Sequence, residues 1–161
     1  MKLHFSFLES AVFLLGSTGA APGSRDAAPV AGACELITRQ EAAAALGAPV
    51  PAGAEKPMNL PLQGRLMKAQ YCLFGSEVLV ARFELGSGGP ALFGQYRQSL
   101  AAKSDYQNVA GVGDEAFLAK GQLAVRKGNT GLIVDVGQAR GGGAKELNAE
   151  KALAALALGR L

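Results

Sequence analysis

The chain has 161 residues and a net charge of +3, which is enough for one ordinary domain and too few for two. Its basic residues are scattered, and only Arg126 and Lys127 are adjacent, so the clustered positive charge of a nucleic-acid-binding surface is missing. The single histidine is His4, near the N-terminus, which excludes Ser-His-Asp and Cys-His catalysis and histidine-based metal sites from the rest of the chain.

The first 20 residues have the layout of a secretory signal peptide. Lys2 precedes an apolar stretch that ends at Leu15, and small residues follow up to Ala20. Residues 21–33 are rich in Ala, Pro and Gly, which favours a disordered linker, so we expect one folded domain over residues 34–161. This layout predicts a periplasmic or extracellular protein. The alternative is an N-terminal amphipathic helix in a cytosolic protein.

Two cysteines, Cys34 and Cys72, are compatible with two different states. An even number of cysteines in an exported chain favours a disulfide between them. In the alternative, the small residues before Cys34 act as a loose lipidation box. Lipidation would tether the protein to a membrane and leave Cys72 as a free thiol. Both states are open on this evidence.

The first element predicted in the folded part is a short helix that begins after Thr38. Thr38 and Glu41 have the spacing of a capping box, in which each side chain satisfies a backbone N–H at the start of the helix. Gly47, followed by Pro49, predicts a left-handed end of the helix. The next segment, residues 49–65, is rich in proline, and we expect an irregular loop there.

Two strands joined by a turn are predicted over residues 69–85. The second strand alternates with period two, which places Arg82 and Glu84 on its more polar face. Pro90 is then suited to the first turn of a helix over residues 90–103. Helical spacing marks the buried face of this helix, which consists of Leu92, Phe93, Tyr96 and Leu100.

Short strands are predicted over residues 106–137, and a long helix over residues 144–161. Gly128 and Asn129 are suited to positive φ in a hairpin turn. The buried side of the last helix is expected to carry Leu147, Ala154, Leu158 and Leu161. The order helix, strands, helix, strands, helix, with tight connections, predicts an α+β fold: an antiparallel β-sheet flanked by helices, with the N- and C-terminal helices packing on the sheet.

The glycines at residues 111–116 match a phosphate-binding motif. Gly111, Gly113 and Ala116 fit the G-x-G-x-x-A variant of the dinucleotide fingerprint. That motif works because a long helix starts at the glycines and directs its N–H groups at the pyrophosphate. The residues after Gly113 instead predict a strand. We therefore interpret this segment as a structural turn and expect no cofactor.

A second glycine-rich segment, residues 137–147, lies between a predicted strand and the last helix. It lacks the Gly-Lys-Ser/Thr ending of a P-loop. Arg140 and Lys145 are nevertheless candidates for an anion-binding site at the start of that helix. The alternative is that the segment is a flexible linker without a ligand.

The remaining catalytic options are a pair of carboxylates or a Ser-Lys arrangement, and neither has a recognisable spacing in this sequence. The candidate carboxylates are Asp114, Glu115 and Asp135. Asp135 stands among large apolar residues. If it is buried, it needs a partner such as Arg82 or Arg126; otherwise it occupies the solvent face of its strand. A carboxylate-dependent glycoside hydrolase would require two of these groups to converge in a cleft.

A resemblance to a group of small exported bacterial proteins, many of them lipoproteins and of no established function, spans residues 34–161. It rests on the segments CELITRQEAAAALGAPV, YCLF, VAGVGDEAFLAKGQLAVRKGNTGLIVDVG and EKALAALALGRL. These are similar to the group's Cys-x-Leu-Leu-Thr, Ala-Leu-Gly-x-Pro, second Cys and Gly-Leu-Gly-Asp-x-Ala pattern. The resemblance implies a PsbP-like fold and a bond between Cys34 and Cys72. It brings no catalytic residues.

These observations together predict an exported, non-catalytic module of the cell envelope. Its expected partner is an envelope protein or a small ligand, with no nucleic acid, metal or cofactor. Membrane attachment is expected only if Cys34 is lipidated. The alternatives are an exported hydrolase that uses carboxylates and a membrane-tethered lipoprotein.

Overall fold

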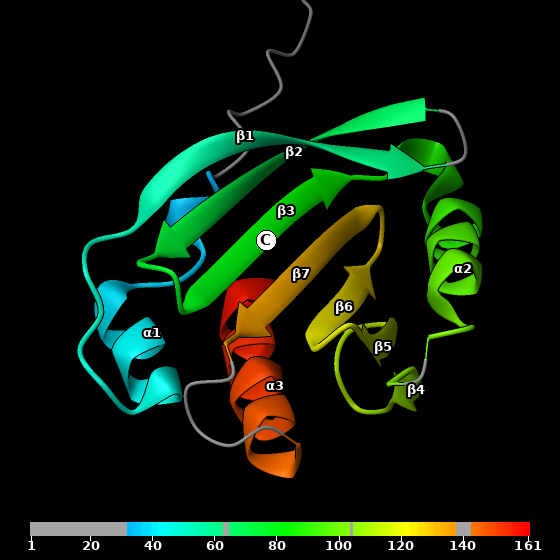
Figure 1. Ribbon diagram of the computed structural model, residues 1–161. Coiled ribbons are helices and arrows are strands. Elements are labelled where there is room, and N and C mark those ends of the chain that lie inside the picture. The colour runs from blue at the N-terminus through cyan, green and yellow to red at the C-terminus, as the bar shows by residue number, and fades with distance from the viewer. Residues whose placement is uncertain (1–31, 63–64, 104, 138–142) are drawn as a thin grey trace, which may run out of the picture.

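A seven-stranded antiparallel sheet organises the described part of the protein (Figure 1). The computed structural model describes residues 32–62, 65–103, 105–137 and 143–161, so the predicted signal peptide lies outside the described residues. All neighbouring strands are antiparallel. In their order across the sheet, the strands are β1 (Ala54–Leu62), β2 (Arg65–Phe74), β3 (Val78–Glu84), β7 (Thr130–Val136), β6 (Gln122–Lys127), β5 (Glu115–Ala119) and β4 (Gln107–Val109).

Helices lie against the sheet and confirm the predicted α+β class. The longest, α3, packs on β6 and β7, and α1 packs on α3 (Figure 1). The third helix, α2, contacts β1 and belongs to the apolar layer on the other face. The helices are η1 (Ala33–Glu35), α1 (Arg39–Leu46), η2 (Gly86–Gly88), α2 (Gly89–Leu100) and α3 (Ala144–Leu158).

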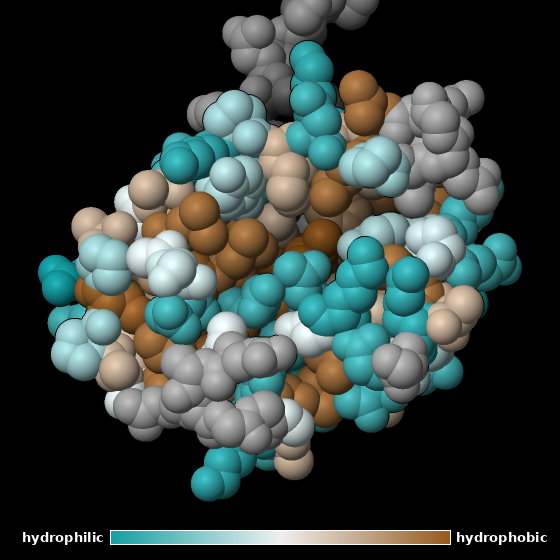
Figure 2. Space-filling model, viewed as in Figure 1, coloured by the Kyte–Doolittle hydropathy of each residue, from teal (hydrophilic) through white to brown (hydrophobic). Residues whose placement is uncertain are grey.

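The sheet separates two apolar layers, because side chains alternate along each strand. On β3, Val78 and Val80 belong to the layer beneath α1 and α3, whereas Ala81 and Phe83 belong to the layer beside α2. Figure 2 shows apolar side chains over β2 and β3 on the face turned to the viewer. In the layer beside α2, the rings of Phe93 and Phe117 lie 5.4 Å apart, which confirms the buried face predicted for this helix.

The two cysteines form a disulfide. It joins Cys34 at the N-terminal edge of the domain to Cys72 in β2, with the two Cα atoms 4.9 Å apart. Cys72 is fully buried. Ala33, assigned above to the linker, starts η1 and is also fully buried, so the ordered domain begins before Cys34.

The first helix has the ends that the sequence predicts. The Thr38 hydroxyl accepts a hydrogen bond from the Glu41 N–H, and the Glu41 carboxylate accepts one from the Thr38 N–H. Gly47 ends the helix with a φ of +69°. A side chain at that φ would be strained, which is why glycine is favoured there.

The irregular loop predicted over residues 49–65 is wrong, because most of it forms β1. This strand lies at the edge of the sheet and pairs with β2 alone. In a central strand every N–H faces one neighbouring strand or the other, so proline, which has no N–H, loses a hydrogen bond there. In an edge strand alternate N–H groups face away from the sheet, and proline at those positions loses none. Pro57 and Pro61 therefore fit β1, where they stand opposite Gln70 and Leu66.

Two-residue turns join β5 to β6 and β6 to β7. The turn between β6 and β7 is the predicted hairpin at Gly128 and Asn129. Gly128 has the expected positive φ, +58°, whereas the positive φ expected for Asn129 is wrong. The first turn consists of Lys120 and Gly121, which have φ values of +57° and +68°. Positive φ at both central residues matches the right-handed twist of the flanking strands.

The long C-terminal helix is confirmed, although its buried side differs from the prediction at its end. Leu147, Ala154 and Leu158 pack against the core as expected, and Leu153 is also buried. The prediction for Leu161 is wrong, because the helix ends at Leu158 and the Leu161 side chain is 42% exposed.

An ion pair ties the C-terminus of the chain to α1. Arg160 donates from Nη1 and Nη2 to the two carboxylate oxygens of Glu41, at 2.7 and 2.6 Å, and from Nη1 to the carbonyl of Leu36 at 2.7 Å. Hydrogen bonding from Arg160 and from the Thr38 N–H lowers the pKa of Glu41 to about 2.

Replacing Glu41 with Gln is expected to reduce the sensitivity of the fold to acid. In the folded protein the pKa of Glu41 lies below its ordinary value of 4.5, because the charged carboxylate is stabilised by its partners. This stabilisation of the fold is present above about pH 4.5 and is lost as the pH falls towards 2. Gln preserves the capping box but not the charge. Urea unfolding at pH 6 and pH 2.5 should show a smaller difference for the variant. An unchanged pH difference would contradict the role given to the ion pair.

Candidate functional site

The glycine turn at residues 111–116 is a structural feature. A strand, β5, starts at Glu115, as the sequence predicts, and not the helix that a dinucleotide site requires. The Asp114 N–H donates to the carbonyl of Arg126 at 2.8 Å, and the Asp114 carboxylate accepts from the Gly128 N–H at 2.7 Å. The turn is therefore held against the β6–β7 hairpin.

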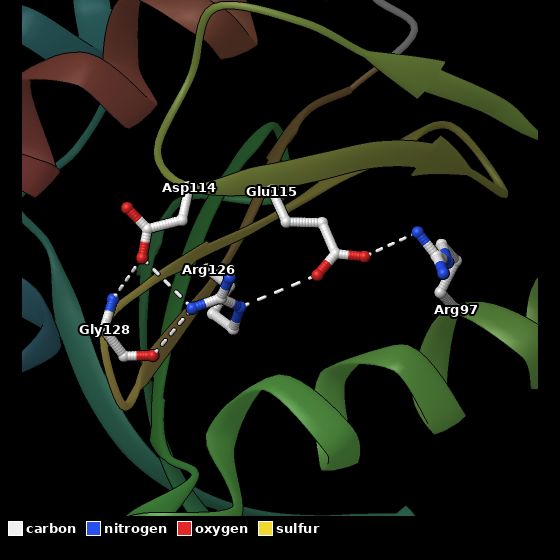
Figure 3. Close-up of polar contacts among 5 residues, drawn as sticks. All are labelled: Arg97, Asp114, Glu115, Arg126 and Gly128. Carbon is white, nitrogen blue, oxygen red and sulfur yellow. Dashed lines mark hydrogen bonds and ion pairs between the residues drawn. The ribbon is translucent and has the colours of Figure 1, made fainter.

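Ion pairs occupy the two carboxylates of this turn (Figure 3). Arg126 Nη1 lies 3.0 Å from Asp114 Oδ2, and Arg126 Nε lies 3.6 Å from Glu115 Oε2. The other oxygen of Glu115 accepts from Arg97 of α2 at 2.6 Å. These contacts connect α2, β5 and β6, which explains the acidic pair without a ligand.

Substituting Gly113 with Ala is expected to destabilise the fold more than substituting Gly111. Both glycines have positive φ, +61° at Gly113 and +80° at Gly111. An alanine at either position therefore incurs backbone strain of roughly 1–2 kcal/mol. At Gly113 the new Cβ would also lie 2.5 Å from the carbonyl oxygen of Arg126, whereas nothing lies within 4 Å at Gly111. We expect an extra loss of about 1–3 kcal/mol for G113A, measured by urea unfolding. Equal losses in the two variants would contradict this account.

Asp135 lies on β7 and is half-buried. It accepts a hydrogen bond from the Gln122 side chain at 3.0 Å, a partner that the sequence did not suggest. On β6, Gln122 is the neighbour of Asp135, and Arg126 is the residue opposite Glu115. Gln122 and Arg126 are four residues apart, which is roughly 13 Å along a strand. Glu115 and Asp135 therefore lie near opposite ends of β6 and do not converge.

The anion site suggested at Arg140 and Lys145 is described only in part. Arg140 lies outside the described residues. Lys145 lies in the first turn of α3 and is exposed. The next residue, Glu146, places a carboxylate at the same helix start. The anion site thus stays a prediction that rests on the sequence alone.

The structure draws attention to a different residue, Glu150, in the middle of α3. It is the one charged residue that is buried among the described residues, with no exposed surface. Its Oε1 atom accepts a long hydrogen bond of 3.4 Å from the Val136 N–H at the end of β7. Its Oε2 atom has no hydrogen-bond partner. A buried polar atom without a partner carries a free-energy cost of about 1–3 kcal/mol.

Glu150 forms part of the wall of a cleft between α3 and the β4–β5 end of the sheet. The cleft has a volume of about 590 Å³. Its lining includes the acidic residues Asp105 and Glu146, the aromatic residue Tyr106 and the apolar residues Leu118 and Leu147. The unpartnered oxygen therefore belongs to a residue that borders a space large enough for a small organic molecule.

Burial and neighbouring acidic groups shift the pKa values of the carboxyls around this cleft. Burial raises the pKa of Glu150 to about 8, and the neighbouring carboxylates of Glu146 and Asp135 add to the increase. Burial, with a contribution from Asp135, also raises the pKa of Glu146. By contrast, backbone N–H groups of Lys120 and Gly121 lower the pKa of Asp105. At neutral pH, Glu150 is therefore mostly protonated beside other acidic groups.

The sequence analysis missed Glu150, although a signal for it exists. The buried positions of α3 follow the helical repeat from Leu147 through Ala154 to Leu158. Glu150 falls on the same repeat, three residues after Leu147 and four before Ala154. A charged residue at a position that the repeat places on the buried face is a candidate functional group. Composition-based reasoning assigns such a residue to the surface.

Among the described residues, no three Asp, Glu, His or Cys side chains are placed so that they could hold a metal ion. In the same ranges, no helix has both the length and the apolar character needed to cross a membrane.

Comparison of the chain with protein-family models, curated proteins and solved structures found no match.

Proposed function

We propose that the protein is an exported, non-catalytic binding module of the cell envelope, with the cleft beside Glu150 as its ligand site. The observation that carries the proposal is that Glu150, whose fully buried carboxyl has an unpartnered oxygen, is one of the residues that line that cleft. Such an oxygen is costly in the free protein, and a bound hydrogen-bond donor would remove the cost. Acidic groups whose pKa is strongly shifted by burial cluster at functional sites.

Export is supported by the disulfide and by the layout of residues 1–20. Disulfides persist in oxidising compartments and are rare where thiols are kept reduced. The Cys34 sulfur, while bonded to Cys72, has no free thiol to carry a lipid. This favours a protein released into the periplasm or the medium over a tethered lipoprotein.

Intact-mass spectrometry of the protein expressed with its own N-terminus in a Gram-negative host tests export. We expect a chain that starts near Ala21, whose cysteines react with an alkylating agent only after reduction. A diacylglyceryl mass on Cys34 would instead make the protein a lipoprotein. An uncut chain with two free thiols would overturn the proposed export.

Native mass spectrometry of the protein purified from the periplasm tests binding. We expect a small-molecule adduct on the wild type that is lost in Glu150→Gln. The control is Glu84→Gln, which changes an exposed glutamate that pairs with Arg82 on β3 and should retain the adduct. An adduct that survives in Glu150→Gln would place the ligand elsewhere. Wild-type protein that is always free of ligand would contradict the binding function.

A further inference from the structure

We propose that the cleft binds an organic ammonium ion with an apolar body, and that Oε2 of Glu150 accepts a hydrogen bond from the ammonium group. This inference rests on the binding function proposed above and names the class of ligand. It follows from three properties of the site: its unpartnered acceptor, its surplus of carboxyls and its mixed lining.

The acceptor is the first property. Oε1 of Glu150 is already held by the Val136 N–H, which orients the carboxyl on α3 against the end of β7. Oε2 has no partner and is buried, so a ligand in the cleft reaches it once the Glu150 side chain turns toward the cleft. A compact –NH₃⁺ group supplies donors that one oxygen can accept, and hydrogen bonds between ionised partners are about twice as strong as neutral ones.

The charge around the acceptor is the second property. Among the described residues, the titratable groups that line the cleft beside Glu150 or act on its pKa come from α3, from β7 and from the segment before β4; they are Glu146, Asp135, Asp105 and Tyr106. Three of these four described groups are carboxyls, and Asp105 also accepts a hydrogen bond from the Gly121 N–H and interacts with the charge of Lys120. An anionic ligand would be repelled by this arrangement, whereas a cation would be attracted.

The lining is the third property, and it distinguishes an organic cation from a metal ion. The described residues hold no group of three ligands suited to a metal. Leu118 and Leu147 instead offer apolar surface to an alkyl chain, and Tyr106 offers an aromatic ring. An ammonium on an apolar stem satisfies the acceptor and buries its stem on these side chains.

Binding of the ammonium exchanges one cation for another at Glu150. The protonated carboxyl releases its proton to the solvent, and the carboxylate that forms accepts a hydrogen bond from the ligand –NH₃⁺ group. Below about pH 8, where Glu150 is mostly protonated, each bound ammonium should therefore release about one proton. Affinity should then rise roughly tenfold per pH unit and level off above this range.

Titration calorimetry with n-hexylammonium chloride tests the proposal. A primary ammonium stays protonated to about pH 10, as lysine does, so the probe keeps its charge. Runs in two buffers of different ionisation enthalpy measure the protons released. We expect saturable binding with about one proton released near pH 6.5, and no comparable binding of 1-hexanol, which has the same chain without the charge.

Two variants locate the site. Glu150→Gln should weaken hexylammonium binding by about 10- to 100-fold, the effect of losing a hydrogen bond to a charged group, and should abolish the proton release. Glu84→Gln should bind like the wild type. The near-ultraviolet circular dichroism of Glu150→Gln, compared with that of the wild type, verifies that the variant is folded.

Four results would overturn the proposal: no binding of hexylammonium, equal binding of 1-hexanol, unchanged binding and proton release in folded Glu150→Gln, or displacement of the probe by Mg²⁺ at equal concentration. Failure here is distinguishable from failure of the binding function itself. A Glu150-dependent adduct in the native mass spectrum, together with no hexylammonium binding, would retain the binding site and reject the ligand class.

Discussion

Removal of the Cys34–Cys72 disulfide is expected to lower the free energy of unfolding by about 4 kcal/mol. The two cysteines are 38 residues apart in the sequence, and the bond closes that segment into a loop in the unfolded chain. Without the bond, the unfolded chain gains conformational freedom, so unfolding becomes more favourable. Domains of this size are typically stable by about 5–15 kcal/mol, so the loss is a large fraction of the total.

Urea unfolding of the double variant Cys34→Ala/Cys72→Ala measures this effect. Alanine avoids placing a hydroxyl at the fully buried position of Cys72. The control is the reduced wild type, which should unfold at nearly the same urea concentration as the double variant because both lack the closed loop. A loss below about 1 kcal/mol would mean that the unfolded chain is already restricted in this segment.

Glu150→Gln is expected to remove the largest dependence of stability on pH. In the wild type, the folded pKa of about 8 lies above the ordinary value of 4.5. The protonated carboxyl therefore stabilises the fold fully below about pH 4.5, and this stabilisation is lost as the pH rises to about 8. The free energy of unfolding should fall by about 1.4 kcal/mol per pH unit over this range.

The variant replaces an ionisable group with a neutral one of the same shape. Its amide oxygen keeps the acceptor for the Val136 N–H. We expect the variant to match the wild type near pH 4.5 and to exceed its stability by several kcal/mol near pH 8. Urea unfolding across this range provides the measurement, with Glu84→Gln as the control that keeps the wild-type slope. Parallel pH profiles for wild type and Glu150→Gln would contradict a buried, protonated Glu150.

Features set by neighbours in the chain were predictable from the sequence. The capping box of Thr38 and Glu41, the left-handed end at Gly47 and the hairpin at Gly128 each depend on a few adjacent backbone groups. The antiparallel α+β class followed from tight turns between alternating strands, because parallel strands need long crossovers. The disulfide was favoured by the even cysteine count in a chain whose first 20 residues are predicted to be a signal peptide.

Features set by distant parts of the chain became visible only in the tertiary structure. The prolines of β1 favour a loop when the sequence is considered alone. The tertiary structure shows that β1 is an edge strand, which pairs with β2 on one side only and therefore tolerates proline. The helical repeat places Glu150 on the buried side of α3, but only the packing of β7 against it shows that its carboxyl is removed from water. The cleft beside it exists because α3 and the β4–β5 end of the sheet meet there. Local backbone preferences are encoded within a few residues, whereas burial and charge environment depend on which segments pack together.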